Sequence, residues 1–163
     1  MRIREKDLYA DVALWLEGRL HRLFPKWGPR VYDTSRFKLS GFLDREGLQG
    51  LFPGSEAFEI EVDVTGILQR GAAAKLAFVE CKTGPITLKD VGQILGYSRV
   101  AYPTLSVIIS PAGMSTSLHL LLTTYNRVDL LDYGDGNRIK IGTWDVGRKQ
   151  VDPASVIPPG ELG

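Results

Sequence analysis

The sequence has few of the residues that form disulfides or hold soft metal ions: among 163 residues there are one cysteine, Cys81, and two histidines. A single cysteine excludes an intrachain disulfide and a cysteine-held zinc or iron–sulfur site within one chain. Any metal ion would therefore have to be held by oxygen. The net charge is only +1, which gives no global signal for nucleic acid, although basic side chains outnumber acidic ones over residues 1–38.

Long apolar runs are absent as well. No stretch approaches the roughly 20 residues that span a bilayer, and residues 1–7 lack the apolar segment of a signal peptide. We therefore expect no membrane partner and a cytoplasmic location. A composition of 44% hydrophobic and 24% charged residues predicts one globular domain over residues 1–150. The prolines of residues 151–163 indicate an extended or mobile C-terminal tail.

Hydrophobic periodicity and turn residues predict an α/β fold. Apolar residues spaced by three and four positions indicate an amphipathic helix over residues 7–24. The same reasoning predicts a short strand at 31–32, an irregular loop at 40–55, strands at 58–68, 75–82 and 105–109, and helices at 87–101 and 115–124. The turn residues 134–137 place a C-terminal β-hairpin between 128–133 and 138–144. The predicted order is helix, three strands, helix, strand and an added C-terminal part.

Glu80 and Lys82 stand two residues apart at the end of an apolar strand. Because a strand alternates its faces, both side chains project to one side and Cys81 projects to the other. Asp63, on the preceding strand, would lie about 5 Å from Glu80 if the two were directly opposed in a hairpin. Two carboxylates this close repel unless a cation lies between them, and Mg²⁺ prefers oxygen ligands. Lys82 would then orient or deprotonate a water that attacks a phosphate.

A site for phosphodiester hydrolysis is one interpretation of these residues, and a solvated ion pair of Glu80 with Lys82, worth less than ~1 kcal/mol, is the other. Asp63 is followed by sixteen intervening residues and then by Glu80-Cys81-Lys82. This pattern resembles the motif of the PD-(D/E)XK nuclease superfamily. The resemblance covers residues 5–110 and includes the order of elements. It implies a restriction endonuclease-like αβββαβ core with a mixed central sheet. It also implies that Asp63 and Glu80 bind metal and that Lys82 serves the hydrolytic water.

Two further ligands follow from the same resemblance. The backbone carbonyl of Cys81 is implied as a metal ligand, and Glu5 at the start of the first helix is implied as a metal or water ligand. Asp11 and Glu17 lie nearby in the sequence and stay open as alternatives to Glu5. Val62 stands where the name of the motif has proline.

The helix after the third strand carries Gln93 and Tyr97, which resemble a glutamine–tyrosine pair of the RecB-like and related branches. Residues four apart share a helix face, and Lys89 lies one turn earlier. The resemblance implies that these three residues contact phosphate or steady the site. An ordinary polar helix face is the alternative. Glu59 and Glu61 share the predicted face of Asp63, and Glu61 stays open as an accessory ligand.

Together these residues predict a Mg²⁺-dependent nuclease, with Mn²⁺ able to substitute and with DNA as the expected substrate. Two other functions stay open: a non-catalytic nucleic-acid or protein-binding module on a nuclease-like scaffold, and a Holliday-junction-type resolvase that acts as a homodimer. Competing sites are not evident, because the sequence offers no nucleophilic triad and no P-loop follows Gly84-Pro85.

Overall fold

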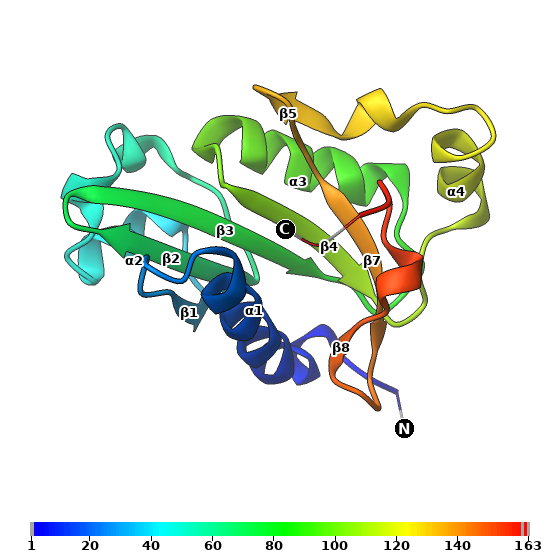
Figure 1. Cartoon of the computed structure of the whole chain (residues 1–163), viewed down its shortest axis with the longest axis horizontal. Coiled ribbons are helices and arrows are strands. Elements are labelled where there is room, and N and C mark those ends of the chain that lie inside the picture. Colours follow the sequence, from blue (N-terminus) through cyan, green and yellow to red (C-terminus); the bar gives the residue numbers. More distant parts are fainter. Residues whose placement is uncertain (1, 161, 163) are drawn as a thin grey trace.

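A six-stranded mixed sheet runs through the molecule, with the strand order β1-β2-β3-β4-β7-β8 (Figure 1). The computed structural model describes residues 2–160 and 162. The strands of this sheet are β1 (Arg30–Asp33), β2 (Val64–Arg70), β3 (Ala73–Cys81), β4 (Leu105–Ser110), β7 (Lys140–Asp145) and β8 (Gln150–Val151). The pairs β3–β4 and β4–β7 are parallel, and the other neighbours pair antiparallel. The predictions of an α/β fold and a mixed sheet are confirmed.

Helices cover both faces of the sheet. The α-helices are α1 (Tyr9–Leu23), α2 (Leu39–Arg45), α3 (Leu88–Ala101) and α4 (Thr116–Leu122). Short 3₁₀ turns are η1 (Glu5–Asp7), η2 (Gln49–Leu51), η3 (Ser55–Ala57), η4 (Val128–Leu131) and η5 (Pro153–Ser155). Figure 1 shows α1 on one face of the sheet and α3 on the other. No helix in the described part of the chain has the length and apolar character needed to cross a membrane.

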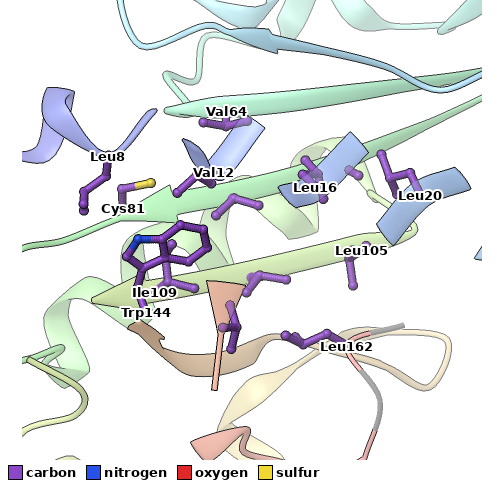
Figure 2. Close-up of a cluster of buried hydrophobic side chains, with 14 of the residues drawn as sticks. Leu8, Val12, Leu16, Leu20, Val64, Cys81, Leu105, Ile109, Trp144 and Leu162 are labelled. Carbon is purple, nitrogen blue, oxygen red and sulfur yellow. The ribbon is translucent and has the colours of Figure 1, made fainter. Parts of the chain in front are cut away.

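Helix α1 packs on the sheet through a stripe of leucine and valine side chains spaced by four residues. Leu8, Val12, Leu16 and Leu20 are buried in one cluster with residues of β2, β3 and β4 (Figure 2). Four-residue spacing keeps these side chains on one helix face, which is why the sequence pattern predicted this helix correctly. The packing fixes the start of α1, and with it the η1 turn, against the end of β3.

Gly66 of β2 allows α1 to approach the sheet closely. A Cβ atom at this position would lie 2.6 Å from Cδ1 of Leu20 and 3.3 Å from Cβ of Ala77. We expect Gly66→Ala to lower the free energy of unfolding by about 1–3 kcal/mol, because the buried helix must shift. Gly18→Ala is the matched control, since Gly18 lies inside α1 with no atom near its Cβ position. This control should raise stability by about 0.5–1 kcal/mol.

Urea unfolding of the two variants beside the wild type measures both changes. A Gly66→Ala protein as stable as the wild type would show that the α1–sheet contact relaxes freely.

Helix α3 lies on the opposite face and begins with a capping box. The Thr87 hydroxyl accepts a hydrogen bond from Asp90 N, and the Asp90 carboxylate accepts one from Thr87 N. At the far end of the helix, Ser98 Oγ lies 2.7 Å from Ser106 Oγ of β4, and this pair is buried. The Ser98–Ser106 contact ties α3 to β4 of the sheet.

Two predictions before β2 are wrong. Residues 40–55 are not an irregular loop, because they contain most of α2 and the η2 turn, packed through buried side chains that include Phe42 and Leu43. The strand predicted at 58–68 begins only at Val64. Residues 58–63 are extended and alternate in burial as predicted, but their carbonyls accept hydrogen bonds from the segment 34–40 instead of joining the β2–β3 ladder.

The C-terminal part also differs from the prediction. Residues 128–131 form the η4 turn, and the turn at 134–137 joins only the short strands β5 (Asp132–Gly134) and β6 (Asn137–Arg138). Strand β7 leaves this hairpin and pairs in parallel with β4, because its apolar residues complete the sheet. The expected tail is packed as well: Ile157 exchanges two backbone hydrogen bonds with Ile141, and Val156 is buried.

Candidate active site

Four charged residues predicted from the sequence meet where β3 ends. Asp63 directly precedes β2, Glu80 lies at the end of β3 and Lys82 follows it, and Glu5 lies in the η1 turn that leads into α1. The Lys82 ammonium is 3.9 Å from Oε1 of Glu80. The Glu5 carboxylate lies near enough to Lys82 and Asp63 for their charges to change its pKa. The structure therefore brings the predicted charged residues into one group.

The carboxylate of Asp63 replaces a backbone carbonyl at the end of the β2–β3 ladder. The last ladder pair is Val64 with Val79, and in the same register Cys81 would lie opposite Val62. Instead, the Val62 carbonyl accepts a hydrogen bond from the Thr34 hydroxyl, and Oδ2 of Asp63 accepts one from Cys81 N at 2.9 Å. This exchange places the Asp63 carboxylate between the two strands, beside Glu80.

Tyr9 supplies the second hydrogen bond to this carboxylate. Its hydroxyl donates to Oδ1 of Asp63 at 3.0 Å. Burial raises the pKa of Tyr9 above its usual value, and the charge of Asp63 raises it further, so the phenol keeps its proton and remains a donor. Both oxygens of Asp63 thus accept a hydrogen bond in this structure. Tyr9 was not predicted from the sequence. Its position four residues after Glu5 is the one sequence signal that could have indicated it.

Glu80 is a buried carboxyl group with an unpartnered oxygen. Its residue is only 5% exposed, and Oε2 has no hydrogen-bond partner among the described residues. Burial raises the pKa of Glu80 well above its usual range, the adjacent Asp63 carboxylate raises it further, and Lys82 lowers it by a smaller amount. Without a cation between the two carboxyl groups, burial and the neighbouring negative charge both favour the protonated form of Glu80.

Lys82 lies between carboxylates from two different parts of the chain. Its side chain is 21% exposed, so the ammonium can reach solvent while its stem is covered. Burial raises the pKa of Glu5, Lys82 lowers it, and Asp63 and Asp90 raise it again. The charges of Lys82, Asp63 and Asp90 therefore all lie close enough to Glu5 to act on its pKa.

Cys81 contributes its backbone rather than its thiol. The side chain lies in the α1 cluster near Leu8, on the face away from Glu80, as the strand alternation predicted (Figure 2). Burial raises the pKa of the thiol, which makes it a poor nucleophile and metal ligand. Because the N–H and C=O of one strand residue point to the same side, the Cys81 carbonyl faces the Asp63 side of β3. The predicted role of this carbonyl is compatible with that orientation.

Gln93 lies at the level of Glu80 along the sheet. Ser98 contacts Ser106, and Ser106 pairs with Phe78 of β3. Gln93 lies five residues before Ser98 along α3, a rise of about 7.5 Å, and Glu80 lies two residues after Phe78 along β3, a rise of about 6.6 Å. The Gln93 residue therefore lies at the level of Glu80, but its exposed side chain is about 140° round the helix from the buried Ser98 face.

The other α3 residues take different positions. The Gln93 amide donates to the hydroxyl of Tyr97 at 3.0 Å, so the predicted pair is joined by a hydrogen bond. The ring of Tyr97 is half-buried and packs against the cluster that contains α2. Lys89 is exposed in the first turn of α3. Gln93 and Lys89 are thus exposed, and Tyr97 contacts Gln93 through this hydrogen bond.

The alternatives to Glu5 lie elsewhere. Asp11 pairs with Lys149 Nζ at 3.3 Å, and Glu17 lies two turns of α1 further from the site. Glu59 and Glu61 are exposed on the segment before β2 and point away from its buried side. These positions favour Glu5 over Asp11 and Glu17.

The donor set fits a hard cation, although the ligands are not preassembled. Across residues 2–160 and 162, no three histidine, cysteine, aspartate or glutamate side chains converge closely enough to hold a metal ion. The orphaned Oε2 of Glu80, buried beside the Asp63 carboxylate, is nevertheless an environment that a cation between the two would stabilise. All available donors are oxygens, as Mg²⁺ and Mn²⁺ prefer.

A cavity of about 770 Å³ lies at the other end of β3 from the candidate site. That cavity is lined by residues that include Phe52, Phe58, Leu76 and Tyr102, and it shares no residue with the group around Glu80. Four residues of β3, or about 13 Å, separate Leu76 from Glu80.

Comparisons of the chain with protein-family models, with curated proteins and with solved structures gave no match. The function is therefore argued from the residues of the site and from their geometry. The restriction endonuclease-like core remains a prediction based on the motif and on the order of elements.

Proposed function

We propose that this chain is a metal-dependent nuclease of the PD-(D/E)XK type, with a restriction endonuclease-like core, and that it hydrolyses phosphodiester bonds in DNA. One observation carries the proposal. The buried carboxyl groups of Asp63 and Glu80 lie side by side, one oxygen of Glu80 is unpartnered, and the Lys82 ammonium lies 3.9 Å from the other. A purely structural role explains this arrangement poorly, because an unpartnered buried carboxyl group is costly to the fold.

Asp63 and Glu80 would hold Mg²⁺ or Mn²⁺, with the Cys81 carbonyl and Glu5 as further oxygen donors. When bound, the ion supplies Lewis acidity at a phosphoryl oxygen. Glu80 would give up its proton on binding, because a carboxylate binds a cation in its ionised form. The affinity for Mn²⁺ should therefore rise with pH.

Lys82 would orient the attacking water and stabilise negative charge that develops on the phosphate. Its ammonium is held near Glu80 and faces the space bordered by Glu5, so it stands beside the proposed cation position without occupying it. Gln93 and Lys89, which are exposed on the α3 side, would contact the phosphate backbone. Tyr97 would hold the Gln93 amide through their hydrogen bond.

A cleavage panel tests this function directly. Single-stranded, duplex and branched DNA and RNA are incubated with the protein in Mg²⁺, Mn²⁺ or EDTA. The Lys82→Ala variant is the control, because cleavage that persists in this variant would come from a contaminating nuclease. We expect cleavage of at least one DNA form that requires the metal ion and is lost in the variant. Binding without cleavage of any form would instead indicate a non-catalytic module, and a strong preference for branched DNA would indicate a junction resolvase.

A further inference from the structure

The carboxylate of Asp63 is held from two sides by parts of the chain that are far apart in sequence. Cys81 N donates to Oδ2 at 2.9 Å, and the Tyr9 hydroxyl donates to Oδ1 at 3.0 Å. The first donor belongs to β3 and the second to the first turn of α1. Two donors on different oxygens fix both the position of the carboxylate and its rotation about the Cβ–Cγ bond.

The donor from α1 is itself firmly placed. Tyr9 is half-buried and packs against the α1 cluster, in which Leu8 and Val12 are buried on either side of it in sequence. The Tyr9 ring therefore has little freedom to turn away from Asp63. The same turn of the chain carries Glu5, four residues earlier, into the site.

From this geometry we infer that Tyr9 is a positioning residue, which holds the Asp63 carboxylate in the orientation that a divalent cation requires. The inference rests on the proposed metal-dependent function. Tyr9 acts through Asp63, and no contact with substrate is assigned to it. Residues that hydrogen-bond a metal ligand from outside typically change metal affinity or activity by about 10–100-fold when they are removed.

Tyr9→Phe removes only the hydroxyl and keeps the ring that packs in the core. We expect it to weaken Mn²⁺ binding about tenfold in a calorimetric titration. We also expect the amide resonance of Cys81 to shift in ¹H–¹⁵N NMR spectra of the metal-free protein, because the carboxylate that accepts its hydrogen bond can then rotate. A purely structural role of the tyrosine would leave that resonance in place.

Two companion variants complete the design. Tyr32→Phe is the matched control: Tyr32 is also half-buried, its ring packs on Phe42, and its hydroxyl makes no hydrogen bond within the described residues. It should change neither measurement. In an Asp63→Asn background, Tyr9→Phe should have no further effect on Mn²⁺ binding, since the residue acts through that carboxylate.

The outcomes separate this inference from the proposed function. Unchanged Mn²⁺ affinity and an unchanged Cys81 resonance in Tyr9→Phe would overturn the inference and leave the nuclease proposal intact. A wild-type protein that binds no Mn²⁺ would overturn the metal-dependent function and, with it, the role of Tyr9 toward a cation. In that case the Cys81 resonance would still report whether Tyr9 holds the carboxylate.

Discussion

Lys82→Ala is expected to lower the rate of DNA cleavage by about 10²–10⁴-fold, the usual contribution of a positioned acid–base group. The Lys82 ammonium lies 3.9 Å from Glu80 and its charge acts on Glu5, so its removal takes a positive charge away from this group of carboxyl side chains. Without it, the attacking water loses its orienting partner and the developing charge on phosphate loses a counter-charge. Single-turnover cleavage in Mg²⁺ at saturating enzyme measures this step.

The loss should be specific to the chemical step. Lys82→Met keeps most of the packing of the side chain and should lose as much activity as Lys82→Ala. Lys26→Ala is the matched control, because Lys26 is exposed at the other end of α1 from Glu5. Lys89→Ala should weaken DNA binding more than it slows cleavage. If Lys82→Met cleaves as fast as the wild type, Lys82 does not serve the reaction.

Glu80→Gln is expected to abolish Mn²⁺ binding and cleavage while making the metal-free protein more stable. In the folded protein, burial and the Asp63 carboxylate raise the pKa of Glu80 above its value in the unfolded chain. Folding therefore takes up a proton, and the stability of the wild type falls as pH rises from the unfolded pKa toward the folded one. Glutamine carries no charge at any pH, so the variant escapes this loss.

The stability gain should consequently depend on pH. At about pH 5 the two proteins should differ little, and at about pH 8 Glu80→Gln should be more stable by about 2–4 kcal/mol. Urea unfolding in EDTA at several pH values measures the difference. Glu61→Gln, which changes an exposed carboxylate on the neighbouring segment, is the control and should show no such trend. An equal gain at every pH would mean that Glu80 is ionised in the folded protein.

Sequence reasoning succeeded where the signal is local. The four-residue apolar spacing placed α1, and strand alternation put Glu80 and Cys81 on opposite faces. It failed where a tertiary contact decides the structure. The segment before β2 pairs with residues 34–40, and β7 pairs with β4 rather than with its neighbour in sequence.

The candidate site shows the same contrast between features set by local sequence and features set by tertiary contacts. The hairpin register correctly placed Asp63 and Glu80 side by side, because antiparallel strands joined by a short turn align in a predictable way. The hydrogen bond from Tyr9 was not predictable, since it depends on how closely α1 packs on the sheet. Neither the exchange of a ladder carbonyl for the Asp63 carboxylate nor the orphaned oxygen of Glu80 has a sequence signature.

The hydrogen bond between Cys81 N and the Asp63 carboxylate has an evolutionary consequence. This buried amide needs an acceptor whether or not the protein cleaves anything, so Asp63→Ala should destabilise the fold as well as the site. If the chain is the nuclease proposed above, a descendant that lost catalysis would therefore still be under selection to keep aspartate or asparagine at this position. The proposed role of Lys82 carries no such structural demand, so under that proposal the lysine would be the better marker of a working enzyme among relatives of this chain.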